Sequence, residues 1–239
     1  MNLKEINGKD NRKKLGVIAG MGPFAATYFI NRLLQLTPAE KEWDYFRIIA
    51  DYNVFIPSRT RALLFNEKSP APAMIETFKN LEKAGAEILA LPCNSGHGWY
   101  DEVEKKINLP WINLIETTSN AVKKRGVDKT LVISAYVPAK KRLYDKYLDN
   151  THYLSEKEQE KVYEIIELLK LGVEKKPIEK KLFDIVKPYQ SSIDAIVIAC
   201  TEPSMLFGMN QKEWGSFQLI DSTNEYAKKC VEVCKGVNL

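Results

Sequence analysis

The chain carries one pattern twice, as A-E-I-L-A-L-P-C-N-S-G-H at Ala86–His97 and as D-A-I-V-I-A-C-T-E-P-S-M at Asp194–Met205. Each copy holds a short apolar run that predicts a buried strand, and a cysteine follows the run, Cys93 or Cys200. Small polar residues come after each cysteine. Ligands bind at the carboxyl ends of the strands in open α/β sheets. The two copies therefore predict a site between two similar lobes, with one thiol from each.

The rest of the chain alternates between strand and helix patterns. Strands are predicted at 15–19, 46–50, 88–91, 109–114, 130–134, 195–199 and 217–220, and helices at 24–36, 73–85, 98–107, 117–125, 139–148, 156–171, 180–190 and 222–233. This alternation is typical of βαβ units, so we expect an α/β fold of two similar lobes, each a mostly parallel sheet flanked by helices. We assign residues 1–114 and 217–239 to the first lobe, with 1–14 as a flexible extension, and residues 115–216 to the second.

The amino-acid composition limits the functions that the chain can have. The 239 residues carry 35 cationic and 31 anionic side chains, a near balance without a dense basic stripe, which argues against nucleic-acid binding. Four cysteines without a Cys-x-x-Cys pair argue against a disulfide framework, and the N-terminus lacks an apolar leader, so we expect the reducing cytoplasm. The longest uncharged run, Leu15–Asn31, is broken by glycines and a proline and predicts no membrane span.

Two thiols that face each other across a substrate can act as an acid–base pair. A thiolate removes a proton from carbon, and the opposite thiol returns a proton to the other face, which inverts that carbon without a cofactor. A thiol has a pKa near ~8.5, and a helix N-terminus lowers it. We expect this lowering at both Cys93 and Cys200, with Asn94, Ser95 and Thr201 as candidate hydrogen-bond partners of the substrate. The alternative is two buried structural cysteines.

Two other stretches suggest anion binding. Gly20-Met-Gly-Pro23 is a tight turn before a helix, but its spacing does not match G-x-G-x-x-G, so another anion is favoured over a phosphate. Arg59 follows the second predicted strand in a proline-marked loop. A carboxylate-binding role and a solvated role are equally compatible with that position.

Taken together, these motifs resemble the aspartate/glutamate racemase family, specifically its aspartate racemase branch. The matching segments extend over nearly the whole chain, from about residue 15 to 234: Gly20–Pro23, Thr37-Pro-Ala39, Ile56-Pro-Ser-Arg-Thr60, Pro92–His97, Leu169-Lys-Leu-Gly172, Cys200-Thr-Glu202 and Asp221-Ser-Thr223. The two cysteine motifs at this separation are specific together, whereas the glycine turn alone is a weak signal.

The resemblance implies cofactor-independent racemization of an acidic amino acid, with Cys93 and Cys200 as the catalytic groups. It favours aspartate over glutamate as the substrate. It also implies an active site in the cleft between the lobes and a homodimer, and it makes Arg59 and Lys170 the cations at the substrate site. An arginine can bind a carboxylate through two hydrogen bonds. The candidate substrate-binding residues are Met21, Asn53, Arg59, Asn94, Ser95, Lys170, Thr201 and Glu202; we expect no metal and no cofactor.

The sequence departs from the family pattern at the second lobe. The turn Ser134-Ala-Tyr-Val-Pro138 replaces a family turn, Ala-Thr-x-Gly-Thr, that faces the cleft. We expect Tyr136 and Val137 to crowd that wall or make it apolar, which bears on the identity of the substrate. Asn94-Ser-Gly-His97 replaces Asn-Thr-Ala-His, Pro203 follows Glu202, and Ser58 stands where the family often has aspartate.

Two further functions stay open on the sequence. One is another proton transfer, a decarboxylation or an isomerization of a small carboxylate, and the other is carboxylate binding without catalysis. For His97 an orienting role in the loop is favoured over direct proton transfer. Cys230 and Cys234, one helical turn apart, are interpreted as packing residues rather than metal ligands.

Overall fold

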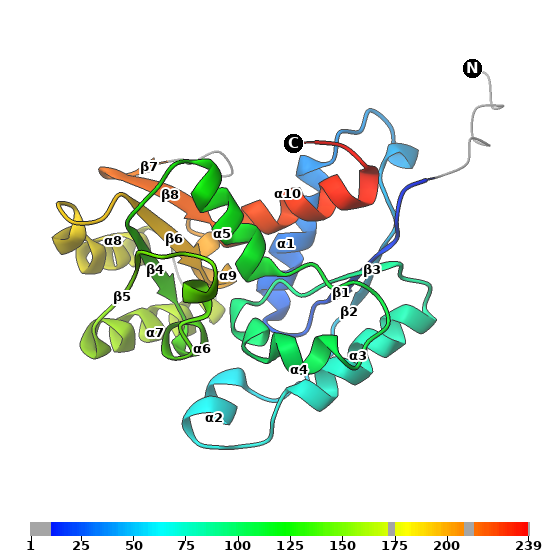
Figure 1. Ribbon diagram of the computed structural model, residues 1–239, viewed down its shortest axis with the longest axis horizontal. Helices are drawn as coiled ribbons and strands as arrows, with labels where there is room; N and C mark the ends of the chain where they lie inside the picture. Colours follow the sequence, from blue (N-terminus) through cyan, green and yellow to red (C-terminus); the bar gives the residue numbers. More distant parts are fainter. Residues whose placement is uncertain (1–10, 172–174, 208–212, 239) are drawn as a thin grey trace.

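The computed structural model describes residues 11–171, 175–207 and 213–238, which form two sheets flanked by helices. Figure 1 shows the three-stranded sheet β2-β1-β3 and the five-stranded sheet β5-β4-β6-β8-β7 side by side. All strand pairs are parallel except β7 with β8. This arrangement confirms the α/β fold with two lobes. Within the described residues, every helix is too short or too polar to cross a bilayer.

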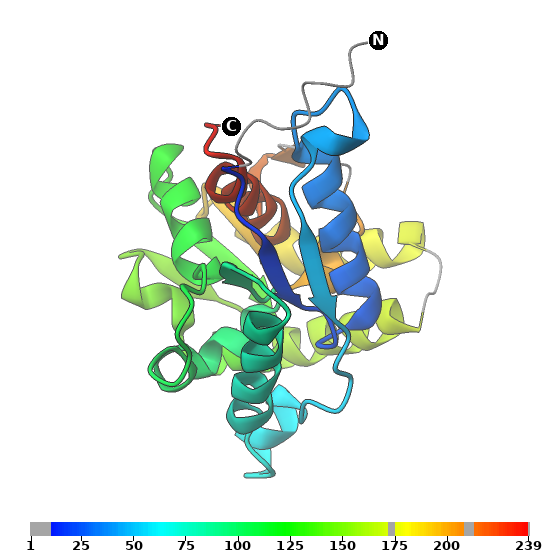
Figure 2. The same ribbon diagram turned by 90° about the vertical axis from the view of Figure 1, so that its right-hand side faces the viewer.

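The first sheet centres on β1 (Leu15–Ile18), which pairs with β2 (Ile48–Asp51) and β3 (Ile88–Ala90). Its helices are α1 (Pro23–Leu36) and α3 (Ala71–Lys83), and Figure 2 shows α1 running alongside β1 and β2. The connections around this sheet contain η2 (Glu42–Asp44), α2 (Arg59–Leu64), η3 (Asn94–Trp99) and α4 (Tyr100–Glu104).

The second sheet centres on β4 (Thr130–Ser134) and β6 (Ala195–Ala199), whose residues are all buried. It is completed by β5 (Thr151–Tyr153), β7 (Glu213–Trp214) and β8 (Phe217–Asp221). The surrounding helices are α5 (Leu114–Lys124), α6 (Tyr136–Lys140), η4 (Leu143–Lys146), α7 (Glu156–Lys170), α8 (Lys175–Val186), η5 (Lys187–Tyr189), α9 (Thr201–Ser204) and α10 (Ser222–Lys235).

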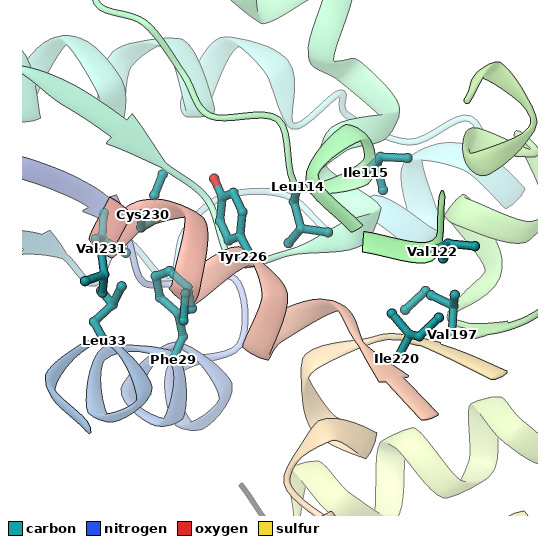
Figure 3. Packing of buried hydrophobic residues seen from close by; sticks show 14 of the residues in the cluster. Phe29, Leu33, Leu114, Ile115, Val122, Val197, Ile220, Tyr226, Cys230 and Val231 are labelled. Carbon is teal, nitrogen blue, oxygen red and sulfur yellow. The ribbon is translucent and has the colours of Figure 1, made fainter. Parts of the chain in front are cut away.

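One hydrophobic cluster joins the two sheets. It contains Val17 of β1 together with Val132 of β4 and Val197 of β6. Helix α10 runs through it, and Figure 3 shows Tyr226 of α10 between Phe29 of α1 and Leu114 of α5. The rings of Phe29 and Tyr226 stack with their centroids 5.5 Å apart. The lobes therefore share a core, which fixes their relative position.

Local capping explains where several helices begin. Ser155 and Glu158 form a capping box at the start of α7. Asn113 accepts the backbone N–H of Glu116 at the start of α5, and Asp221 accepts that of Thr223 at the start of α10.

The structure corrects the predicted lobe boundary. The strand at 217–220, expected in the first lobe, is β8 and pairs in parallel with β6 of the second sheet. The helix after it, α10, packs on α1 of the first lobe as well as on α5 and β6. Of the expected extension 1–14, residues 1–10 lie outside the described residues, and the Lys13 backbone N–H donates to the Cys234 carbonyl.

Several element predictions are also wrong. The strand expected at 109–114 is reduced to a single bridge between Leu89 and Trp111. The helix expected at 98–107 is split into η3 and α4, and the one at 139–148 into α6 and η4. The segment with Arg59, expected to be a loop, is the start of α2, because the Ser58 hydroxyl accepts the Arg61 backbone N–H and caps it.

Candidate active site

The two thiols end in one cavity between the sheets. Cys93 lies two residues beyond Leu91, after β3, and Cys200 follows β6 directly and stands at the N-cap position of the short helix α9. Both are almost completely buried, and both line a cavity of about 90 Å³. Of the other residues predicted for the site, the cavity brings together Met21, Arg59, Asn94, Ser95, Lys170, Thr201 and Glu202.

Asn53 is not among the residues that line this cavity. Its side-chain amide donates to the Thr77 hydroxyl at 2.8 Å, and its backbone lies against Gly20. A Cβ atom at Gly20 would lie 2.0 Å from the Asn53 carbonyl oxygen. Asn53 therefore fixes the path of the glycine turn, and the expected contact with the substrate is not supported.

Cys200 is paired with a carboxylate. Its Sγ donates a hydrogen bond to Oε2 of Glu202 at 3.1 Å. Burial raises the pKa of the Cys200 thiol well above its usual value, and the negative charge and hydrogen bond of Glu202 raise it further. The expected lowering of this pKa is therefore wrong. The four-residue helix α9 offers little dipole, and its own glutamate opposes the thiolate.

The glycine turn makes room for the same carboxylate. A Cβ atom at Gly22 would lie 2.7 Å from Oε1 of Glu202, and Gly22 has a φ of 90°, which L side chains rarely adopt. The turn Gly20–Pro23 thus accommodates a protein carboxylate from the other lobe. Met21, also in the turn, is buried against the cavity.

His97 holds the Cys93 loop from behind. Its Nε2 accepts the backbone N–H of Leu114 at 3.0 Å, so the proton lies on Nδ1, which donates to the Cys93 carbonyl at 2.9 Å. Burial lowers the pKa of His97 to about 4, so the ring is neutral at physiological pH. His97 does not line the cavity with the thiols, and its contacts fit the orienting role.

Asn94 and Thr201, both expected to bind substrate, use their side chains to tie the loops in place. The Asn94 amide donates to the Ser222 hydroxyl at 3.0 Å, and its carbonyl accepts from the Tyr144 hydroxyl at 2.7 Å. The Thr201 hydroxyl donates to the Pro92 carbonyl at 2.9 Å, which links the loops of the two lobes.

The last helix supports both thiol loops. The Tyr226 hydroxyl donates to the Ile112 carbonyl and accepts the backbone N–H of Leu91 at 3.1 Å, just before the Cys93 turn. The Ser204 hydroxyl bonds Oδ1 of Asp221 at 2.6 Å and also lies 3.1 Å from the Cys200 carbonyl. Residues 221–226 therefore contact the supports of both cysteines.

Two cations reach the cavity from opposite lobes. Arg59 begins α2; its Nη1 donates to the Pro57 carbonyl, and its buried Nε has no hydrogen-bond partner among the described residues. Lys170 ends α7, where its Nζ lies 2.7 Å from Oε1 of Glu167. Burial favours the neutral amine, but the hydrogen bond with Glu167 and the charge of Glu202 outweigh it and raise the pKa of Lys170.

Six lining residues are not among the residues predicted for the site: Gly22, Ser58, Thr60, Ala135, Tyr163 and Ile166. The first four lie in segments that the sequence singled out, whereas Tyr163 and Ile166 do not. A helical signal was available for two of them, because Tyr163 and Ile166 precede Lys170 by seven and four positions and share its face of α7.

The second-lobe turn differs from its expected form. Ala135 is the residue of this turn (134–138) that lines the cavity. Tyr136 instead packs on Tyr163 with ring centroids 4.9 Å apart, and Val137 is buried against Gly98. The expectation that Tyr136 and Val137 form the cavity wall is therefore wrong.

Comparisons with known proteins agree with this fold. The family model for Asp/Glu/hydantoin racemase matches residues 18–230. An aspartate racemase from Picrophilus torridus superimposes with a TM-score of 0.82 at 27% identity, over 92% of this chain and 93% of that chain. A glutamate racemase from Bacillus anthracis shares the fold, with a TM-score of 0.66 at 17% identity over 92% of this chain and 80% of that one. The broad specificity amino-acid racemase RacX of Bacillus subtilis is 25% identical over 224 residues, covering 91% of this chain and 96% of the relative.

Proposed function

The chain belongs to the Asp/Glu/hydantoin racemase family, and from this premise we propose that it inverts the α-carbon of aspartate by proton transfer between Cys93 and Cys200. That it is an amino-acid racemase, and thus an isomerase, follows from the family and from its relatives. The aspartate preference, the roles of the two thiols and the absence of a cofactor are the proposal.

One observation carries the mechanism: a thiol from each sheet lines the same small cavity. Cys200 starts as a thiol that donates a hydrogen bond to Glu202, and the Cys93 thiolate removes the α-proton and becomes a thiol. Cys200 then donates its proton to the opposite face of the planar carbanion and becomes the thiolate. The product has the inverted configuration, and the reverse sequence serves the other enantiomer.

The substrate preference rests on the charges and the size of the cavity. The buried Nε of Arg59 and the ammonium group of Lys170 suit the carboxylates of a dicarboxylic amino acid. Positive charge held close to the substrate also stabilises the negative charge that develops when the α-proton leaves. A cavity of about 90 Å³ favours aspartate over glutamate, which is one methylene longer.

We also propose a homodimer and a cytoplasmic location. Three large apolar side chains within three sequence positions of a cavity residue, Phe24, Phe55 and Leu171, are 76%, 90% and 79% exposed. A second copy would remove such side chains from water. Four cysteines that are all free are compatible with a reducing compartment. Analytical ultracentrifugation tests the dimer, and a monomer at micromolar concentration would exclude it.

Proton NMR in deuterated water tests the reaction. The protein is incubated without added cofactor with L-aspartate, L-glutamate or L-asparagine. We expect the α-proton signal of aspartate to disappear while the D-isomer appears on a chiral column. Replacing Cys93 or Cys200 by serine is expected to abolish inversion while the protein stays folded. Binding of aspartate without exchange would overturn the proposal and favour a carboxylate-binding function.

A further inference from the structure

The last turn of α7 holds an ion pair at the edge of the cavity. Lys170 lines the cavity, whereas Glu167, one turn earlier on the same helix, lies outside the lining. Their charged atoms are 2.7 Å apart, and the two side chains are 45% and 46% exposed. The pair is therefore about half exposed to water, and its lysine faces any ligand that enters the cavity.

The surroundings keep Glu167 near the site. Tyr163, one turn before it, lines the cavity and packs on Tyr136. Burial raises the pKa of Tyr163, and the carboxylate of Glu167 beside it adds to this effect. The same carboxylate thus lies between two cavity residues, Tyr163 and Lys170.

We propose that Glu167 is a specificity-determining residue that competes with the side-chain carboxylate of the substrate for Lys170. This inference rests on the proposed function, in which Lys170 binds that carboxylate. In the empty cavity Glu167 occupies the cation. An acidic substrate has to displace it, whereas a neutral side chain leaves the pair intact.

The charges around the cavity explain why this competition affects selectivity. Arg59 and Lys170 contribute two positive charges, and Glu202 contributes a negative charge beside Cys200. When Glu167 pairs with Lys170, the site loses its excess of positive charge. The cavity then discriminates less strongly between acidic and neutral amino acids than its two cations suggest.

Steady-state kinetics of Glu167→Gln test the inference with L-aspartate and L-asparagine as substrates. A half-exposed ion pair is weak, so we expect the KM for aspartate to fall by about two- to five-fold. The kcat for aspartate and both constants for asparagine stay within about two-fold, since Glu167 does not line the cavity that holds the two thiols. A change in folding or stability alone would not separate KM from kcat or acidic from neutral substrates.

Two further variants make the result decisive. Glu164→Gln removes an equal charge from an exposed position on α7 and is expected to leave all constants unchanged. Lys170→Met is expected to raise the KM for aspartate by at least ten-fold. If Lys170→Met has this effect and Glu167→Gln leaves the KM for aspartate unchanged or higher, the competition is refuted while the proposed function stands. If the unmodified protein does not turn over aspartate, the proposed function fails and this inference fails with it.

Discussion

Replacing Glu202 by glutamine removes the charge beside the Cys200 thiol and keeps the size of the side chain. The thiol donates to this carboxylate at 3.1 Å in a buried site, so ionising Cys200 places two negative charges side by side. A hydrogen bond to a charged group contributes about 1.5–3 kcal/mol. Without this hydrogen bond, which stabilises the thiol form, the Cys200 thiolate is about 10- to 150-fold more abundant at a fixed pH below the pKa of Cys200.

Alkylation by iodoacetamide measures that change, because the thiolate is the reacting species. The assay uses a Cys93→Ser background, so that Cys200 is the cavity thiol. Burial raises the pKa of Cys230 and of Cys234, the latter to about 12, which keeps both unreactive. A more acidic thiol is also a weaker nucleophile, so the net rate at neutral pH is expected to rise by about 4- to 15-fold.

Access to the buried thiol is a separate variable, and the full pH–rate curve separates the two. Its midpoint reports the pKa of Cys200, whereas its plateau reports nucleophilicity and access. We expect the midpoint to move to lower pH in Glu202→Gln and to stay in place in Glu164→Gln. An unchanged midpoint in Glu202→Gln would refute the electrostatic role assigned to this carboxylate.

Three more predictions concern the supports of the site. The pKa of His97 falls from about 6.5 in the unfolded chain to about 4 on folding, so between these pH values the unfolded state binds one more proton than the folded state. The free energy of unfolding should therefore drop by about 3 kcal/mol between pH 7 and pH 4, and by less in His97→Gln. Urea titrations at each pH measure this change. Gly22→Ala forces a Cβ to 2.7 Å from the Glu202 carboxylate at a φ of 90°, so kcat should fall at least about ten-fold and stability by about 1–3 kcal/mol; unchanged kinetics would contradict the packing described for the glycine turn. Thr201→Val leaves the Pro92 carbonyl without its donor and should cost about 1–3 kcal/mol in thermal unfolding, whereas Thr201→Ser should retain most of the stability.

The central strands could be predicted from sequence for a physical reason. Parallel strands buried on both faces, such as Thr130–Ser134 and Ala195–Ala199, consist of nearly continuous apolar residues. The run at 109–114 looked similar but contains Pro110, which has no N–H to donate, and Asn113, which caps α5 instead of extending a strand. The partner of 217–220 was not predictable, because an apolar run does not specify which sheet it joins.

The candidate site shows the same limit. Both cysteines and both cations could be found by their position after strands or in motifs, and the cavity contains all four. The protonation state of Cys200 could not be predicted, because it depends on the direction of the Glu202 side chain. That direction is set by the space at Gly22, a residue 180 positions earlier in the chain.

The supports that α10 gives to both thiol loops have a consequence for synthesis of the protein. A growing chain carries both cysteines once residue 200 has left the ribosome. The hydrogen bonds that the Asn94 amide donates to Ser222 and that the Leu91 backbone N–H donates to Tyr226 form only later, when α10 emerges. Until then the nascent chain holds the reactive groups without the geometry that pairs them, so catalysis begins only when the last helix has docked.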